Sequence, residues 1–223
     1  MLRSQLQQPN HVTHELKTPL TAIQGAAELL QDGGGDLSPE RLMYAYRNAI
    51  FPWYSDEQPI LWWSPQPRFV IYPEHLKISR SLTKTLRGER FEVTSNQAFK
   101  EVVEACAQPR TSHDGTWITQ DMKTAYNDLH ALGHAMSIEC WYDGSLAGGL
   151  YGVHLGQVFF GESMFSRVSD ASKFALVALG HHASHWGIEL IDCQVETDHA
   201  ATIAKGFPPN FLPLASLENC VHR

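Results

Sequence analysis

The chain has 223 residues, of which 43% are hydrophobic and 18% are charged, and its formal net charge is −7. This is the composition of a globular protein with one large domain or two unequal ones. There is no run of about 18 apolar residues, so no membrane-spanning helix is expected. The first residues lack the apolar core of a secretory signal. The four cysteines show no paired spacing, which argues against structural zinc and a disulfide framework. We therefore expect a cytoplasmic protein.

The N-terminal part of the chain predicts two helices and an irregular segment. Residues 11–31 carry a heptad-like apolar seam, interrupted by Pro19, and a glycine run follows. A second helix is expected to begin with Ser38 as N-cap and Pro39 in the first turn. Residues 51–68 are rich in proline and tryptophan, so we expect loop or short strand there.

From residue 69 onward the pattern is mixed, and it predicts an α+β fold. Thr119 is the expected N-cap of one helix, and Asp143-Gly144 predicts a tight hairpin turn. The expected helices are 96–107, 120–132 and 170–185, and the expected strands are 69–73, 115–119, 136–142, 145–153, 157–165 and 189–196. An antiparallel meander, then a helix, then a strand suits a sheet with helices on its faces.

Three polar side chains interrupt apolar strands of this pattern. Glu162 lies in FFGESMF, and Asp192 and Gln194 lie in LIDCQV. A carboxylate in such a strand is paired, solvated in a cleft or functional. Asp192 and Gln194 are two residues apart, so in a strand they would share a face and could hydrogen-bond. A satisfied core network and a functional site are both open at this point.

Other unusual groups have an ordinary interpretation and a functional one. Tryptophans such as Trp53 and Trp117 belong to a core or interface, or they form a stacking platform for an unpaired base. The basic run that contains Arg80 and Lys84 is a solvated helix face, or a strip that contacts phosphates. We interpret His181, His182 and His185 as surface histidines, because no third metal ligand accompanies them at motif spacing.

Several long strings resemble one enzyme family. GGDLSPERL, AYRNAIFPWYS, ILWWSPQPR, ISRSL, GTWIT, LGHAMSIECW, GGLYGV, GESMFSRVSDASK and LIDCQV occur in order between about Gly34 and His199. They resemble the leucyl/phenylalanyl-tRNA–protein transferases of the bacterial N-degron pathway. The resemblance implies a small N-terminal domain (33–67) and a transferase domain (68–223) with the acetyltransferase-like (GNAT) fold, a mixed sheet with flanking helices. Residues 1–32 would be an atypical helical extension.

The resemblance also implies a reaction. The α-amine of a protein that starts with Arg or Lys attacks the ester of Leu-tRNA or Phe-tRNA, and Met is transferred weakly. The acceptor protein is thereby marked for degradation. No cofactor, metal or membrane is implied, and we expect a monomer. By resemblance, Gln194 lies beside the attacking amine and is oriented by Asp192, while Glu162 lines the same cleft.

Further site residues are carried over by position. Leu150, Met164 and Ile191 match the apolar pocket for the aminoacyl side chain, whose shape would disfavour β-branched residues. The positions that match contacts to the terminal adenosine of the tRNA are Trp53, Trp117, Tyr46 and Tyr126. Arg80 and Lys84 match a basic strip for the tRNA backbone.

Both ends of the chain depart from this family. Residues 11–30 resemble the phosphoacceptor helix of sensor histidine kinases, with His14 at the phosphorylated position. No ATP-binding motif accompanies them, so we do not expect kinase activity. Residues 200–223 lose most of the family's Gly-Ala-x-x-Ile-Pro-Arg run and form an atypical tail, expected to lack a strong helix.

Two other functions compete with the transferase. One is an acetyltransferase of the same fold that uses acetyl-CoA, although the Gln/Arg-x-x-Gly-x-Gly/Ala loop that holds the pyrophosphate is missing. The other is a non-catalytic fusion or dimerisation module built on the kinase-like helix.

Overall fold

A seven-stranded mixed sheet organises the protein. The structure is a computed structural model, and it describes residues 35–76, 82–84, 91–109, 116–195, 210–212 and 220–221. The strand order is β4-β5-β6-β7-β8-β3-β9, and only the β7–β8 pair is parallel among the described strands. The strands are β3 (Arg68–Ile71), β4 (Glu92–Ser95), β5 (Ala135–Tyr142), β6 (Ser145–Leu155), β7 (Val158–Ser166), β8 (Leu190–Asp192) and β9 (Asn210–Leu212).

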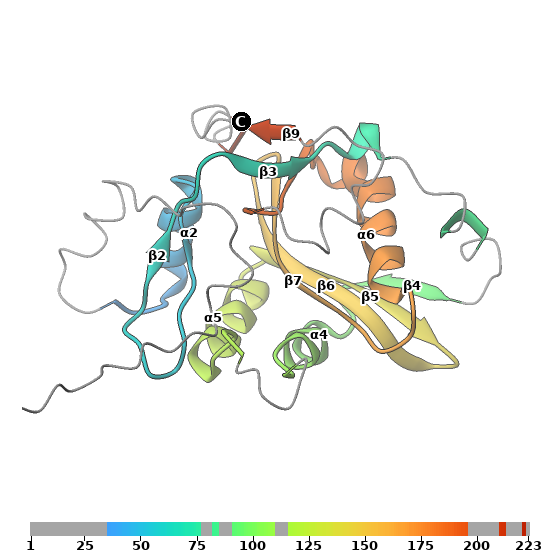
Figure 1. Ribbon diagram of the computed structural model, residues 1–223, viewed down its shortest axis with the longest axis horizontal. Coiled ribbons are helices and arrows are strands. Elements are labelled where there is room, and N and C mark those ends of the chain that lie inside the picture. The colour runs from blue at the N-terminus through green and yellow to red at the C-terminus, as the bar shows by residue number, and fades with distance from the viewer. Residues whose placement is uncertain are drawn as a thin grey trace, which may run out of the picture.

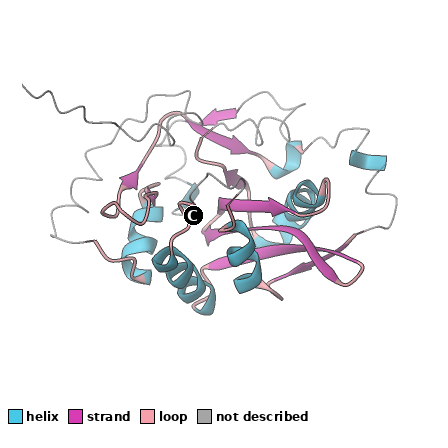
Figure 2. Cartoon of the chain, turned by 60° about the horizontal axis from the view of Figure 1, so that its bottom comes forward, coloured by secondary structure: helices cyan, strands magenta, loops and turns pink. Residues whose placement is uncertain are grey.

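Helices cover both faces of this sheet (Figure 1). Helices α4 (Phe99–Cys106) and α5 (Gln120–Ala131) lie on one face, and α6 (Ala171–His182) lies on the other, followed by the short helix η2 (Ala183–Trp186). Figure 2 shows the same layers from below, with the helices crossing the strands. Each face has its own apolar cluster, one that includes Val102, Tyr126 and Phe160 and one that includes Phe69 and Leu179. The α+β class with a mixed sheet and flanking helices is confirmed.

The central meander follows its local sequence signals. Asp143 and Gly144 have φ values of 49° and 69°, the left-handed pair that a two-residue hairpin turn requires. The turn sets the pairing of Tyr142 with Ser145, from which β5 and β6 run in register apart from one irregularity at Cys140. Thr119 caps α5, because its side chain accepts the Met122 N–H at 3.2 Å. These predictions are confirmed.

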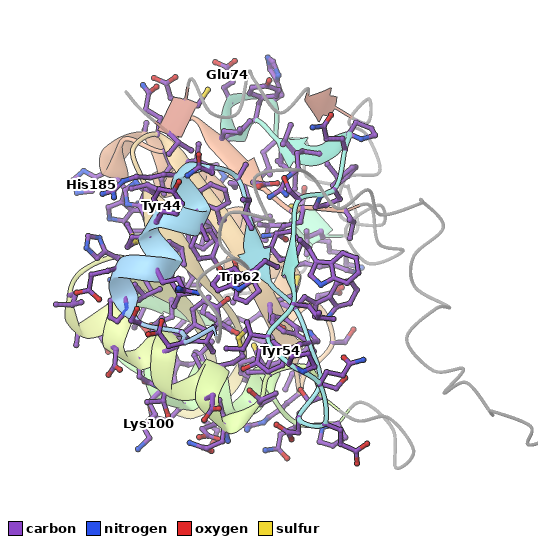
Figure 3. The ribbon with its side chains drawn as sticks, turned by 90° about the vertical axis from the view of Figure 1, so that its left-hand side faces the viewer. Tyr44, Tyr54, Trp62, Glu74, Lys100 and His185 are labelled. Atoms are coloured by element: carbon purple, nitrogen blue, oxygen red, sulfur yellow. The ribbon has the colours of Figure 1, made fainter. Side chains whose placement is uncertain are left out.

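A small N-terminal unit packs on the face of the sheet that α5 covers. Helix α2 (Pro39–Arg47) begins after Ser38 with a proline in its first turn, as predicted. It is followed by the short hairpin of β1 (Phe51–Pro52) and β2 (Trp62–Trp63). In Figure 3 Trp62 lies in the interior near α2, and Tyr44 lies on the outer side of that helix. This unit brings Tyr46 against the main sheet.

The structure differs from the sequence predictions where pairing is long-range. Residues 116–119 form no strand, because Thr119 already turns into the cap of α5. Strand β8 ends at Asp192, four residues earlier than predicted, because the chain turns there. The edge strands β4 and β9 and the short helix η1 (Pro73–His75) were not predicted. The predicted helix 11–31 lies outside the described residues.

Candidate active site

Glu162 lies at a bulge in the middle of β7. The pairing of Tyr151 with Ser163 is followed directly by the pairing of Gly152 with Gly161, so Glu162 has no partner on β6. Bulges redirect a side chain and are common beside active sites. This one directs the Glu162 carboxyl group to the face of the sheet that α2 and α5 cover.

Two buried tyrosines hold the Glu162 carboxyl group. The Tyr46 hydroxyl, from α2, lies 2.7 Å from Oε1, and the Tyr126 hydroxyl, from α5, lies 2.7 Å from Oε2. The two hydroxyl oxygens lie 2.8 Å from each other. Both tyrosines are fully buried, whereas Glu162 keeps part of its surface exposed. Three elements that are distant in sequence therefore meet at one carboxyl group.

The three contacts of this cluster bear on its protonation. With Glu162 ionised, both phenolic protons go to the carboxylate, and the contact between the hydroxyls of Tyr46 and Tyr126 holds no proton. With Glu162 protonated, each group donates to the next around the ring, so every contact holds one proton. The geometry accommodates both states, which suits a carboxyl group that accepts and releases a proton.

The electrostatic surroundings of Glu162 agree with this ring. Burial raises its pKa to about 7, and the nearby Asp192 charge also raises it, whereas hydrogen bonds from Tyr46 and Tyr126 and the Arg68 charge lower it. Burial, and next the Glu162 charge, hold the pKa of each of these tyrosines well above the usual range. Glu162 is the one group of the ring whose pKa lies near neutrality.

Asp192 ends β8 and is fully buried in an ion pair with Arg68 of β3. The Arg68 Nη2 donates to Oδ2, and Nε donates to Oδ1 at 3.3 Å. Oδ1 also accepts the backbone N–H of Gln194 at 2.9 Å. Neither charged side chain has any exposed surface. Both oxygens of Asp192 are thus held by charge-assisted or backbone hydrogen bonds inside the protein.

Gln194 lies in a turn after β8, so the expectation that it shares a strand face with Asp192 is wrong. Its φ of 58° is left-handed, which is uncommon for a residue other than glycine. The link to Asp192 runs through the Gln194 backbone and not through its side chain. Its side-chain Nε2 is buried and has no hydrogen-bond partner in the described part of the chain. An unpartnered buried amide is costly in a resting protein and is available to a ligand.

The sheet opens beside these groups. Strand β8 pairs with β7 over Val158–Phe160, and β7 then continues to Ser166 without a described neighbour on that side. The predicted pocket residues Leu150, Met164 and Ile191 lie in the apolar cluster of the α6 face. Leu150 is paired with Met164 across β6 and β7. All three lie on the face opposite to Glu162, but Ile191 pairs with Phe159, five positions before Met164 on β7, so their role as one pocket stays a prediction.

The two predicted stacking tryptophans lie on neighbouring segments. Trp53 and Trp117 are both partly exposed and pack against the same apolar cluster. The residue after Trp53, Tyr54, lies within 3.3 Å of the Thr119 hydroxyl, which joins the two segments. Tyr46 and Tyr126, in contrast, are buried and point to Glu162. Contact of all four with adenosine stays a prediction.

The remaining predicted residues divide into described and undescribed ones. Lys84 is exposed, whereas Arg80, His14 and most of the tail 200–223 lie outside the described residues. The three histidines at 181, 182 and 185 are exposed, as expected. In the part of the chain that is described, no cluster of three or more His, Cys, Asp and Glu side chains is arranged to hold a metal ion. Nor does any described helix have both the length and the apolar character to cross a bilayer.

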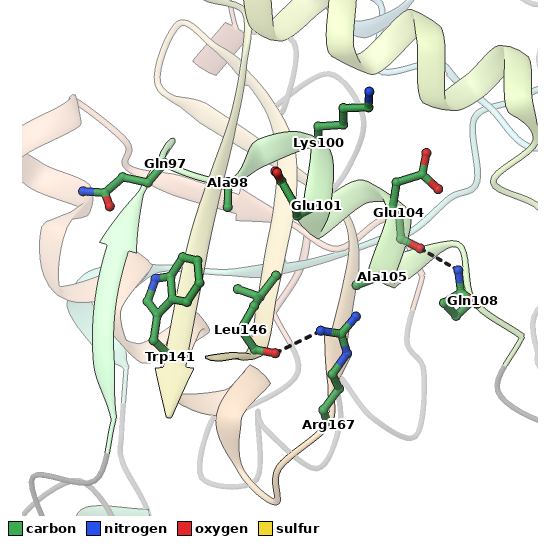
Figure 4. A pocket seen from close by; sticks show the side chains of 10 residues that line it. All are labelled: Gln97, Ala98, Lys100, Glu101, Glu104, Ala105, Gln108, Trp141, Leu146 and Arg167. Carbon is green, nitrogen blue, oxygen red and sulfur yellow. Dashed lines mark hydrogen bonds between the residues drawn. The ribbon is translucent and has the colours of Figure 1, made fainter. Parts of the chain in front are cut away.

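A surface groove of about 600 Å³ lies apart from this cluster (Figure 4). It runs between α4 and the ends of β5 to β7, and Trp141, Leu146 and Arg167 form one wall. The Arg167 side chain donates to the Leu146 carbonyl oxygen at 3.1 Å. None of the predicted site residues lines this groove, so we do not assign it to the candidate active site.

Arg68 is the site residue that the sequence analysis missed. It precedes the apolar run FVI and follows a proline, so the sequence places it at the end of the predicted irregular segment 51–68. A charged residue that directly begins a strand buried at every position was the available signal. Its partner is 124 positions away, and no local pattern reveals such a pair.

Comparison with protein-family models matches one family over most of the chain. The model described as leucyl/phenylalanyl-tRNA protein transferase matches residues 70–207, and that of its N-terminal domain matches residues 35–66. The His Kinase A (phospho-acceptor) domain matches residues 4–49, in agreement with the resemblance of the N-terminal segment.

Curated relatives agree with these matches. A leucyl/phenylalanyl-tRNA–protein transferase of Aromatoleum aromaticum is 55% identical over 83% of this chain and 78% of its own length. One of Chromobacterium violaceum is 53% identical over 85% of this chain and 82% of its own length. A solved GCN5-related N-acetyltransferase from Kribbella flavida is similar with a TM-score of 0.40 and 10% identity, over 84% of this chain and 61% of that chain. On the family models and the two curated relatives, the chain belongs to the leucyl/phenylalanyl-tRNA–protein transferase family.

Proposed function

We propose that this transferase moves Leu or Phe, and Met weakly, from aminoacyl-tRNA to the N-terminal Arg or Lys of acceptor proteins, and so marks them for degradation in the cytoplasm. The observation that carries the proposal is the Glu162 carboxyl group, whose pKa of about 7 responds to the nearby Asp192 charge. Asp192 in turn accepts the backbone N–H of Gln194, the residue with the unpartnered buried amide. Family membership supplies the donor and the acceptor class.

The reaction requires two proton movements and no covalent intermediate. The acceptor amine forms a bond to the aminoacyl carbonyl carbon, and the ester bond to the ribose oxygen breaks. The N-terminal ammonium group first loses one proton to a base. As the amide forms, the nitrogen loses a second proton, and the ribose oxygen gains one. Because the ester is already activated, positioning and proton transfer are the main tasks of the enzyme.

Glu162 is the group we assign to the first proton. A base is most effective when its pKa lies near the working pH, and Glu162 meets this condition. Asp192 remains paired with Arg68, and we assign it to orientation. Gln194 is a neutral amide and a poor base, so its free Nε2 donor suits a carbonyl oxygen or a relaying water. The negative charge of ionised Glu162 favours a cationic acceptor, whereas that of Asp192 is compensated by Arg68.

The donor side of the proposal rests on the remaining predicted residues. Leu150, Met164 and Ile191 would accept an aliphatic side chain without a β-branch or an aromatic one, because thioether and leucine surfaces adapt to both. Trp53 and Trp117 are exposed enough to stack on the terminal adenosine. Arg80 and Lys84 would contact the acceptor-stem backbone. The division into extension, small N-terminal domain and transferase domain is part of the same proposal.

Transfer of labelled Phe from Phe-tRNA to peptides tests the function. One peptide starts with Arg and a matched peptide starts with Ala, and we expect label in the first only. RNase treatment should abolish transfer, whereas acetyl transfer would require CoA and resist RNase. A non-catalytic module would bind tRNA and label neither peptide. A phosphotransfer role would survive Gln194→Ala and be lost in His14→Ala, the reverse of the expected result.

A further inference from the structure

Arg68 has the largest fully buried side chain among the described residues, and its guanidinium group links Asp192 to the N-terminal unit. Its guanidinium group makes a two-pronged ion pair with Asp192, and neither side chain is exposed. Its third nitrogen, Nη1, donates to the Ala49 carbonyl oxygen at 3.2 Å. The Phe51 ring lies 5.3 Å from the guanidinium carbon. A planar fork with fixed donors suits this arrangement, and a lysine cannot reproduce it.

The contact with Ala49 anchors the guanidinium group in place. Ala49 has a left-handed φ of 53°, and its carbonyl oxygen also accepts the Ser64 hydroxyl at 3.1 Å. This carbonyl belongs to the segment between α2, which carries Tyr46, and β1. Arg68 thus ties the catalytic end of β8 to the N-terminal unit.

Two sets of hydrogen bonds hold Gln194, one through the Arg68 side chain and Asp192 and one through the backbone of Phe69. Oδ1 of Asp192 accepts both the Arg68 Nε and the Gln194 backbone N–H, so rotation of the carboxylate would break the second bond. The residue next to Arg68, Phe69, donates its N–H to the Gln194 carbonyl at 3.2 Å and accepts the Cys193 N–H at 2.9 Å. The left-handed turn at Gln194 is therefore held by β3 on both sides.

We propose that Arg68 is a positioning residue of the transfer reaction: its side chain fixes the Asp192 carboxylate and, through it, the turn that presents Gln194. The inference rests on the proposed function, and it adds a residue that touches neither substrate. A merely structural ion pair would predict a loss of stability alone.

The charge of Arg68 also affects the pKa of Glu162, which a purely structural ion pair elsewhere in the protein would not do. The groups that face Glu162 are Tyr46 from α2, Tyr126 from α5, Tyr151 from β6, Asp192 from β8 and Arg68 from β3. Of the two charges among them, Asp192 raises the pKa of Glu162 and Arg68 lowers it. Removal of the guanidinium group leaves the Asp192 charge uncompensated, so the pKa of Glu162 rises.

The test compares Arg68→Lys and Arg68→Gln with Arg47→Gln, the same change at an exposed arginine on α2. Rates of transfer to the Arg peptide are measured from about pH 6 to about pH 9. We expect Arg68→Lys to lower kcat roughly tenfold or more, with little change in the KM for the peptide. The acid limb of its pH–rate profile should also change little, because the positive charge is kept. Arg68→Gln should also move the acid limb to higher pH. Arg47→Gln should match the wild type.

Two further measurements distinguish a misfolded variant from a wrong role for Arg68. Binding of an amide-linked phenylalanyl-adenosine, which has no ester to react, shows that each variant is folded. In ¹⁵N-labelled protein, the Gln194 resonances should shift in Arg68→Lys, and those of Gln58, which lies in an exposed loop, should not. Unshifted Gln194 resonances, or a kcat in Arg68→Lys equal to that of the wild type, would overturn the role of Arg68. Wild-type protein that transfers nothing would overturn the proposed function instead, and the resonances still decide whether Arg68 positions Gln194.

Discussion

The hydroxyl oxygens of Tyr46 and Tyr126 lie 2.8 Å apart, although each also contacts a different oxygen of Glu162. Helix α2 of the N-terminal unit and helix α5 on the face of the main sheet therefore share one proton network with β7. The network links the packing of the two parts of the chain to the protonation of a single carboxyl group.

Removal of one phenol should change the pH dependence of transfer. In Tyr46→Phe the carboxylate of Glu162 loses a donor that lowers its pKa, so the pKa rises above 7. Because we assign the ionised form to proton removal, the rate should fall a few-fold at neutral pH and recover at higher pH. The measurement is kcat/KM against pH. Tyr44→Phe, at a residue that is 49% exposed, is the matched control. An acid limb that does not move would remove Glu162 from the role of base.

Stability should depend on pH through the same residue. The folded pKa of Glu162, about 7, lies above the ordinary value of 4.5. Stability from this group is therefore fully present below about pH 4.5 and is lost as the pH rises through 7. Glu162→Gln cannot ionise, so it should raise the free energy of unfolding at pH 8 by at most about 3 kcal/mol, with little effect near pH 5.

Thermal or chemical unfolding at both pH values measures this effect of Glu162→Gln. Glu57→Gln, at an exposed position, serves as the control and should change neither value. Transfer activity of Glu162→Gln should fall while its stability rises. If Glu162→Gln stabilised the protein equally at pH 5 and pH 8, ionisation of Glu162 would not destabilise the folded state.

The bulge at Glu162 should depend on one glycine of a pair. A Cβ at Gly152 would lie 2.1 Å from the Phe160 carbonyl oxygen, whereas a Cβ at Gly161, its partner across the strands, would meet nothing closer than 3.7 Å. We expect Gly152→Ala to lower the free energy of unfolding by about 2–4 kcal/mol and to reduce transfer, and Gly161→Ala to be tolerated. Denaturant titrations of the two variants give the comparison, and equal losses would contradict it.

The tryptophans should contribute to donor binding by stacking. Trp53→Ala and Trp117→Ala should each weaken the binding of an amide-linked phenylalanyl-adenosine by about 1–3 kcal/mol, roughly 5–150-fold. Trp53→Phe and Trp117→Phe keep an aromatic ring and should retain most of the affinity. Equilibrium titration gives these values. If the alanine variants bound as the wild type does, the adenosine would lie elsewhere.

Local signals predicted the elements that local physics determines. The start of α2 at Pro39, the cap at Thr119 and the hairpin turn at Asp143 each depend on a few neighbouring residues. The end of β8 depends instead on the turn that Asp192 and β3 impose, and β4 and β9 exist because distant strands offer an edge to pair with.

The same distinction applies to the site. The sequence alone predicts three candidate site residues, because polar groups rarely interrupt apolar runs: Glu162, Asp192 and Gln194. The bulge that directs Glu162, and the left-handed turn that removes Gln194 from the strand, follow from pairing that the sequence does not display. The role of Arg68 could not be predicted for the same reason, because it depends on an ion pair with Asp192, which is 124 positions away.

The position of β3 between β8 and β9 sets an order on the biogenesis of this protein. Arg68 leaves the ribosome 124 positions before Asp192, so its charge has no counterion while the meander and α6 are being synthesised. The ion pair, and with it the Gln194 turn, can assemble only after β8 has been translated. Nascent or prematurely terminated chains that end before that strand cannot build the site, so they are inactive while they are incomplete.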